Sequence, residues 1–445
     1  MQQKVSFSTY VVIGTMLFGL YFGAGNLIFP IQLGQLAGTH FWLALGGFLV
    51  TAIGLPFLGI LAIGLSGSNG LLDLANRVHP LFGVIFSIAL YLTIGPFFAI
   101  PRTATVPFVV GFEPYIGVEH TTLWLALFSL VFFAIVYYLS LNPAKIMDYV
   151  GKYLTPAFLI MLFVLIVISI IKPMGAFGEP AGDYVTQAFM TGFKEGYNTM
   201  DALASLAFGI VVIAAIKRTG ISDRKEIAKV TWKAGIFAMA LMTLLYGLIA
   251  YMGASSLAIV GTLENGGLIF AAVAEHYFGA FGAILLAAII VLACLKTSIG
   301  LITSCSEFFN ELYPKVSYQR FVLILCLVSF GIANFGLSKI IQFAVPVLMF
   351  IYPLAIVLIL LTFVTNKRAV YVTTILLTFF VSIIDGYTAL VANIPAVQIG
   401  FLENTATFYA EVLPFYGIGL GWLVPAFIGA VLGSVIEKLL LRRKL

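Results

Sequence analysis

Long apolar stretches alternate with short polar ones along the chain. About 18 or more apolar residues are needed to cross a bilayer as a helix, and stretches of this length recur throughout the sequence. We predict twelve spans, which cover residues 8–37, 41–66, 80–110, 121–141, 150–172, 184–216, 229–254, 279–309, 319–336, 338–364, 369–392 and 414–440. This pattern predicts an all-α polytopic membrane protein.

A glycine-rich interruption, GLYFGAGNLIFP at residues 19–30, lies inside the first span. Irregular backbone at bilayer depth costs several kcal/mol unless it lines a protein cavity, and Gly23 and Gly25 permit an unwound stretch. The carbonyls of residues 19–22 would then face a cation, and the amides of residues 24–26 an anionic group. The alternative is a patch of small residues for helix packing.

The sixth span carries a second interruption. The stretch GFKEGYNTMD at residues 192–201 is polar, yet it leads directly into an almost wholly apolar segment. Each interrupted span is followed by four more, so we predict two five-span repeats over residues 8–172 and 184–364, with two additional spans over 369–440. Because five is odd, the second repeat is inverted. Paired interruptions in inverted repeats point to the binding site of a transporter near the bilayer midplane.

Composition and charge support this class. With 62% apolar and 9% charged residues, the chain cannot be a soluble domain. If the N-terminus is cytoplasmic, eighteen of the 23 basic residues fall on the cytoplasmic side, in loops or at span ends, and only Lys172 and Lys339 fall outside. The remaining three, Arg102, Lys194 and Lys296, lie within spans. The eighteen are Lys4, Arg77, Lys145, Lys152, Lys217, Arg218, Arg224, Lys225, Lys229, Lys233, Lys315, Arg320, Lys367, Arg368, Lys438, Arg442, Arg443 and Lys444.

This distribution predicts a multi-pass protein with both termini in the cytoplasm. The net charge of +5 therefore reflects topology and gives no argument for nucleic-acid binding. Nothing before the first span resembles a cleavable signal peptide, so we expect that span to remain.

Other classes of chemistry find little support in the sequence. The three cysteines fall in or beside apolar spans and imply no disulfide framework. The four histidines map to loops or span ends, so no intramembrane metal cluster can be built from them. The Asp-x-x-Asp pairs that a membrane transferase would use are missing. The sequence does not favour an enzyme.

The stretch at residues 19–30, together with GPFFAIPRTAT at residues 95–105, resembles the bacterial branched-chain amino acid carrier family. EGYNTMDAL at residues 195–203 resembles the sixth span of that family, and the similarity extends over the whole chain. The resemblance implies a sodium-coupled symporter for leucine, isoleucine and valine, with a LeuT-type fold, in the bacterial inner membrane. A proton-coupled or ion-independent permease or exchanger of the same fold is the alternative.

The resemblance implies a sodium site between the first and eighth spans. Gly19 and Phe22 would supply backbone carbonyls, in an alignment that needs one residue of gap. Thr297 and Ser298 match the hydroxyl pair that completes the site, and Cys294, on the same helical face as Thr297, could add a carbonyl. The alternative is that these hydroxyls bond back to a carbonyl one turn earlier.

The resemblance also implies a substrate site at the first interruption. The Tyr21 carbonyl and the Asn26 side chain would lie near a second cation site and the substrate ammonium. The amides of Ala24 and Gly25 would receive the substrate carboxylate. The three branched-chain amino acids differ by one methylene or its position, worth about 1 to 3 kcal/mol in an apolar pocket, so we expect overlapping specificity.

Further polar residues are candidates for the substrate site. Tyr197, Asn198 and Asp201 belong to the second interruption. Asn198-x-x-Asp201 also has the spacing of a capping box, whereas Asp201 could instead contact the substrate amine or a coupling proton. Tyr91, in the third span, could bind the substrate carboxylate through its hydroxyl or could simply pack.

Lys296 departs from the pattern of a sodium site. A lysine inside the membrane should face the bundle interior or snorkel to the interface. Its ammonium could occupy a cation position and give proton-coupled or sodium-independent transport. It could also pair with a carboxylate such as Asp201 or Glu307.

Alternating access would move the first and sixth spans against the third, fourth, eighth and ninth. Gly23, Gly25 and Gly196 would lie near the flexible joints. Arg102 lies among prolines that kink the third span, and we expect a gate or a structural ion-pair residue there. We assign no transport role to Asp385, and the last two spans would serve packing or self-association.

Overall fold

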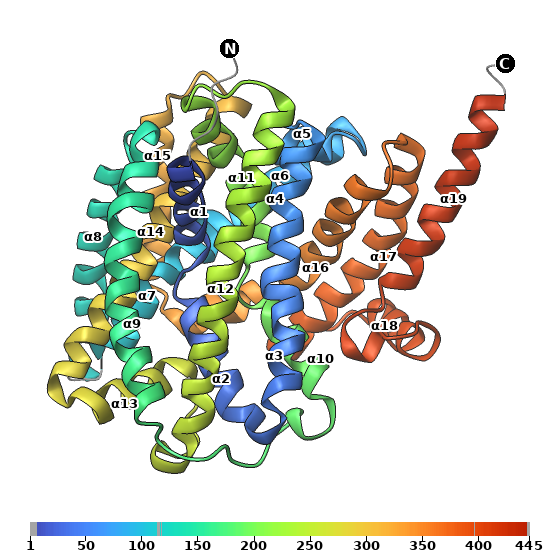
Figure 1. Ribbon diagram of the computed structural model, residues 1–445. Coiled ribbons are helices and arrows are strands. Elements are labelled where there is room, and N and C mark those ends of the chain that lie inside the picture. The colour runs from blue at the N-terminus through green and yellow to red at the C-terminus, as the bar shows by residue number, and fades with distance from the viewer. Residues whose placement is uncertain (1–6, 114–115, 117, 396, 443–445) are drawn as a thin grey trace.

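The computed structural model describes residues 7–113, 116, 118–395 and 397–442. Within these ranges the regular secondary structure is helical, with no strands (Figure 1). Ten helical segments of this part of the chain are long and apolar enough to cross a membrane, and two shorter apolar helices, Phe7–Tyr21 and Tyr318–Ala333, accompany them. The predicted fold class, an all-α polytopic membrane protein, is confirmed.

Each of the twelve predicted spans contains helical structure. The helices within them are α1 (Phe7–Tyr21), α2 (Gly25–Ala37), α3 (Phe41–Leu49), α4 (Leu55–Ser66), α6 (Pro80–Leu92), α7 (Ala99–Gly111), α8 (Thr121–Ser140), α9 (Thr155–Ile171), α10 (Tyr184–Tyr197), α11 (Asp201–Arg218), α12 (Arg224–Val260), α14 (Ala280–Leu312), α15 (Tyr318–Ala333), α16 (Leu337–Val364), α17 (Arg368–Asn393) and α19 (Leu423–Arg442). Three helices that the apolar pattern does not predict lie in the connections: α5 (Leu71–Ala75), α13 (Gly266–Phe278) and α18 (Gly400–Val412).

The interrupted helices lie at the centre of the molecule. In the 18-residue apolar stretch of the α10–α11 segment 89% is buried, whereas in that of α19, at the edge of the helical array in Figure 1, 17% is buried. α1 packs against α11, α12 and α14, and α2 packs along α12. The contact between α2 and α12 is close, because a Cβ at Gly34 would lie 1.8 Å from the Ala250 carbonyl oxygen.

The first predicted break is confirmed. α1 ends at Tyr21 and α2 begins at Gly25, and no side chain caps the start of α2. The Gly23 amide donates to the Tyr21 carbonyl at 2.8 Å and to the Asn26 Oδ1 at 2.9 Å. The Asn26 side chain therefore holds the turn between the two half-helices.

The second predicted break is also confirmed, although its details differ from the expectation. α10 ends at Tyr197, α11 begins at Asp201, and Met200 between them has a left-handed φ of 63°. The capping-box interpretation is wrong, because the start of α11 has no side-chain cap and the Asn198 amide donates to Glu195 at 3.1 Å. Gly196 lies within α10, where its missing Cβ would meet the Thr51 hydroxyl at 1.9 Å.

The third span is kinked where its glycine and proline meet. Gly95 has φ −87° and ψ −127°, outside the helical region, and Pro96 follows it. The kink that the sequence predicts is thus found at Pro96, and α7 restarts at Ala99 and continues through Pro101 and Pro107.

The start of α1 and the end of α19 lie at the same end of the molecule (Figure 1). This end also holds the C-terminal end of α11. Its cytoplasmic orientation and the division into inverted repeats stay predictions. Lys4, Arg443 and Lys444, which contribute to the charge count, lie outside the described residues.

Candidate functional site

A cavity of about 40 Å³ lies between the two helix breaks. Residues of the first break form much of its wall, and α7, α11 and α14 complete it. The predicted site residues that line it are Tyr21, Gly23, Ala24, Gly25, Asn26, Arg102, Asp201 and Thr297. Segments far apart in the sequence thus meet at one small cavity in the core.

The remaining wall of this cavity is largely apolar. Leu20, Ile94, Ala204, Phe208 and Leu301 are among its lining residues. Aliphatic and aromatic side chains of this kind can bury an aliphatic group, at about 0.8 kcal/mol per CH₂. The cavity therefore has a polar side near the breaks and an apolar side between α1, α7, α11 and α14.

Asn26, Asp201 and Tyr246 form a buried cluster that joins the two breaks. The Asn26 Nδ2 donates to the Asp201 Oδ2 at 2.6 Å and makes a second hydrogen bond to the Tyr246 hydroxyl. The Tyr246 hydroxyl donates to the same Asp201 oxygen at 3.0 Å. Since Asn26 belongs to α2, Asp201 to α11 and Tyr246 to α12, the cluster couples both broken helices to a third.

Lys296 lies midway along α14 and is fully buried. Its ammonium donates to the Gly19 carbonyl at 3.3 Å and also to the Phe22 carbonyl. These are the two carbonyls for which the resemblance implies a sodium ion. The alternatives of snorkelling and of a carboxylate partner are wrong here, because the side chain is buried and neither predicted carboxylate pairs with it. Glu307 pairs with Arg218, and Asp201 accepts from Asn26 and Tyr246.

Aromatic rings surround the Lys296 ammonium on its other sides. The Nζ atom lies 4.4 Å from the ring centroid of Phe158, 5.5 Å from that of Phe22 and 5.6 Å from that of Phe18. Cation–π contacts of this kind are worth about 2 kcal/mol or more when water is excluded. Carbonyl oxygens and ring faces together therefore replace the water shell of the ammonium.

The other predicted ion ligands occupy three different environments. The Thr297 hydroxyl donates to the Gly19 carbonyl at 3.5 Å and lines the cavity, so it does not bond back within its own helix. The Ser298 hydroxyl is buried without a hydrogen-bond partner among the described residues. Cys294 is fully buried on α14 and lies outside the cavity lining.

Arg102 lies between the cavity and the second break. Both of its Nη atoms donate to the Asn198 carbonyl at 3.4 Å, and its guanidinium lies 5.9 Å from the Phe29 ring centroid. An ideal Cβ at Gly25 would lie 3.2 Å from its Nη2. The guanidinium of α7 thus reaches both the start of α2 and the end of α10.

Three predicted substrate ligands do not line the cavity. Tyr91 donates to the Ala207 carbonyl at 3.1 Å and stacks on Phe308 with centroids 4.1 Å apart, as the packing alternative expected. Tyr197 stacks on Tyr352, whose hydroxyl donates to the Tyr197 carbonyl at 2.7 Å. Asn198 contributes through its carbonyl, which accepts from Arg102.

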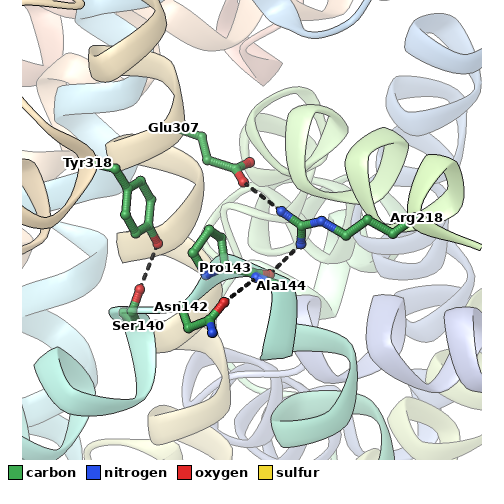
Figure 2. Close-up of polar contacts among 7 residues, drawn as sticks. All are labelled: Ser140, Asn142, Pro143, Ala144, Arg218, Glu307 and Tyr318. Atoms are coloured by element: carbon green, nitrogen blue, oxygen red, sulfur yellow. Dashed lines mark hydrogen bonds and ion pairs between the residues drawn. The ribbon is translucent and has the colours of Figure 1, made fainter.

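A second polar cluster joins α11, α14 and the loop after α8 (Figure 2). Arg218, at the end of α11, lies 4.0 Å from Glu307 of α14 and donates to the Pro143 carbonyl at 2.6 Å. Tyr318 donates to the Ser140 carbonyl at 2.7 Å beside it. The cluster ties the second half of the broken sixth span to α14 and to the loop after α8.

Sequence analysis missed Tyr246 and Phe158. Tyr246 lies in a long apolar span where nothing marks it, and its role depends on α12 packing against both breaks. Phe158 is one of 40 phenylalanines in the chain, so its place beside Lys296 has no local signal. Both follow from tertiary packing.

The fold and cavity define a membrane transporter with two broken helices around a central site. Two solved transporters share the fold. MhsT in complex with L-phenylalanine is 16% identical, with a TM-score of 0.57 and coverage of 99% of each chain. MHP1, a nucleobase-cation-symport-1 family transporter, is 14% identical, with a TM-score of 0.56 and coverage of 89% of this chain and 93% of that one.

The chain belongs to the branched-chain amino acid transport protein family, whose model matches residues 6–440. It is 46% identical to the branched-chain amino acid permease BrnQ of Bacillus subtilis, over 98% of each chain. It is 40% identical to the branched-chain amino acid transport system 2 carrier protein of Pseudomonas aeruginosa, over 97% of this chain and 96% of the relative. The chain is therefore a transporter and not an enzyme.

Proposed function

We propose that this protein takes up leucine, isoleucine and valine across the bacterial inner membrane by cation-coupled symport with alternating access. The family and the names of the relatives supply the substrate class. The apolar wall of the cavity suits an aliphatic side chain, and its polar side faces both helix breaks. A cavity of about 40 Å³ holds only a few water molecules, so it widens when the substrate enters.

The substrate lies with its charged groups toward the breaks. The amides of Ala24 and Gly25, at the uncapped start of α2, attract the substrate carboxylate. The ammonium lies on the side of Asn26 and Asp201, whose carboxylate complements its charge. The side chain extends toward Phe208 and Leu301.

The coupling cation is a proton carried by Lys296. The observation that carries this proposal is the ammonium bound to the Gly19 and Phe22 carbonyls. A buried lysine exchanges its proton readily when its surroundings change, and movement of α1 changes the surroundings of this one. Protonation would hold α1 against α14, and deprotonation would release it.

Sodium, the coupling ion that the resemblance implies, is the second candidate. The carbonyls of Gly19 and Phe22 and the hydroxyls of Thr297 and Ser298 are neutral oxygens of the type that hard cations bind, and the Ser298 hydroxyl is buried without a partner among the described residues. In this case the Lys296 side chain must leave the carbonyls before sodium binds. Sodium would then compete with the ammonium for the same oxygens.

Alternating access opens the cavity to one side at a time. The contacts of Arg218 with Glu307 and Pro143 tie α11 to α14 and to the loop after α8 (Figure 2), and they contribute weakly to closing one end of the molecule. We propose that this end is cytoplasmic, since the loops placed there carry the excess of basic residues. Arg102, whose guanidinium lies 5.9 Å from the Phe29 ring centroid, serves with Phe29 as the outer gate.

Uptake into proteoliposomes tests this function. Radiolabelled leucine uptake is measured under an inward proton gradient without sodium, under an inward sodium gradient at equal pH, and with neither gradient. Accumulation driven by the proton gradient supports Lys296 as the carrier, and accumulation driven only by sodium supports the second candidate. No leucine uptake under any condition would contradict the substrate assignment.

A further inference from the structure

We propose that Arg102 binds the substrate carboxylate and selects amino acids over analogues that lack this carboxylate. This inference rests on the proposed function, because it gives one residue a role in recognising the substrate of that site. It goes beyond the gate role, since a gate closes the cavity without contacting the ligand charge.

The first observation is the unpaired charge of Arg102. In the part of the chain that the structure describes, no carboxylate oxygen lies within 4.0 Å of its guanidinium. Its hydrogen bonds go to one backbone carbonyl, that of Asn198, at 3.4 Å for both Nη atoms. Bonds of this length are weak, and a guanidinium has five N–H donors arranged as a fork that matches a carboxylate.

The second observation is the position of this charge. Arg102 lines the central cavity, and its Nη2 lies 3.2 Å from the place where a Cβ on Gly25 would be. Gly25 is the first residue of α2, which has no side-chain cap. The guanidinium and the positive end of the helix therefore meet at one point of the cavity wall, where an anion is stabilised.

The third observation is an orphaned hydroxyl on a residue of the cavity wall. The Tyr21 hydroxyl is buried without a hydrogen-bond partner among the described residues, and Tyr21 lines the cavity at 2% exposure. A buried polar group of this kind costs about 1 to 3 kcal/mol unless a ligand satisfies it. A polar ligand is therefore expected in the cavity.

The cavity also holds a charge of opposite sign. Asp201 lines it, is 2% exposed, and accepts hydrogen bonds from Asn26 and Tyr246 at Oδ2. One guanidinium and one carboxylate in a single small cavity complement a zwitterion. Arg102 takes the carboxylate end, because like charges exclude the ammonium from it.

Competition binding tests this assignment. Purified protein is equilibrated with radiolabelled leucine, which is displaced by unlabelled leucine or by leucinamide, where a neutral amide replaces the carboxylate. The wild type is expected to prefer leucine. In Arg102→Gln this preference falls about 10- to 100-fold, the range of one or two hydrogen bonds to a charged group.

Arg77→Gln is the matched control, because Arg77 also donates to a backbone carbonyl, that of Ser66, but lies outside the cavity. Its preference should equal that of the wild type. An Arg102→Gln protein that binds leucine with an unchanged preference overturns the inference and leaves a gate role. If the wild type binds no leucine, the proposed function fails instead.

Arg102→Lys resolves the case in which Arg102→Gln binds neither ligand. Lysine keeps the charge and loses the fork, so leucine should still be preferred, although less strongly. A lysine variant that binds leucine and leucinamide equally, or that binds neither while its melting temperature matches the wild type, overturns the inference.

Discussion

The two helix breaks present the same problem, freed backbone carbonyls in the core, and solve it differently. At the first break, the Gly19 and Phe22 carbonyls accept from the fully buried ammonium of Lys296. At the second, the Asn198 carbonyl accepts two long bonds of 3.4 Å from Arg102, which lines the cavity. A cationic side chain thus serves each break, but only one of them is enclosed by rings and carbonyls.

This difference indicates which of the two cations, Lys296 or Arg102, is available to a ligand. Lys296 is bound on several sides by protein groups, so it acts as an internal cation that holds α1 against α14. Arg102 is held weakly and faces the cavity, so a substrate carboxylate can take its donors. The same distinction separates Lys296, the proposed coupling cation, from Arg102, the proposed cation for substrate recognition.

The largest effect is expected from Lys296→Arg, which keeps the charge but enlarges the head group. The site is fully enclosed by Phe18, Phe22 and Phe158, and overpacking costs about 1 to 3 kcal/mol, so leucine uptake should fall about 10- to 100-fold. Lys229→Arg, at an exposed ion pair on α12, should leave uptake unchanged. Normal uptake by Lys296→Arg would contradict a closely packed site.

Tyr246→Phe probes the cluster that joins the two breaks. The change removes the hydroxyl that Asp201 and Asn26 share, and we expect the initial uptake rate to fall about 10-fold. Tyr277→Phe removes a hydroxyl that bonds the Lys172 carbonyl away from the cavity, and it should have no effect. Equal rates in both variants would show that the cluster does not couple the breaks.

Gly23→Ala tests how closely the first break approaches α14. An added Cβ would lie 3.1 Å from the Thr297 hydroxyl, and the required shift is expected to cost about 1 kcal/mol, or about a fivefold loss of uptake. Gly331→Ala is the control, since a Cβ there meets no atom within 4 Å. A loss in the control as large as in Gly23→Ala would refute the contact.

The smallest effect is expected from Arg218→Gln at the far end of the broken sixth span. The ion pair with Glu307 spans 4.0 Å with Arg218 40% exposed, and such pairs contribute about 0 to 1 kcal/mol, so leucine exchange should change about twofold. Arg320→Gln, an exposed arginine at the start of α15, serves as the comparison. A change of about 10-fold or more would make this pair a principal closing contact.

Much of the fold follows from the sequence because bilayer-length apolar runs and glycine-rich interruptions are local signals. Both breaks and the kink at Gly95 appear where the pattern predicts them. The flexible joint at Gly196 stays a prediction; in the structure the left-handed residue of the second break is Met200, and Gly196 allows a close approach to Thr51. The sequence therefore located the breaks better than it explained them.

Part of the candidate site was also predicted, because local sequence signals place the residues of the breaks. Residues within the breaks, such as Ala24, Gly25 and Asn26, line the cavity because the interruption itself places them there. Whether Tyr91 and Tyr197 face the cavity depends on the rotation of a whole helix about its axis. Apolar periodicity does not fix this rotation when a helix is apolar on every face. Whether Lys296 snorkels, pairs or fills a cation position depends on packing between α1, α9 and α14.

The most direct test of the account compares Lys296→Thr with the wild type in proteoliposomes without sodium, with an inward proton gradient driving radiolabelled leucine. The account predicts that the wild type accumulates leucine, whereas the variant only equilibrates it and regains accumulation when a sodium gradient is supplied. Proton-driven accumulation by Lys296→Thr equal to that of the wild type would contradict the assignment of Lys296 as the coupling cation.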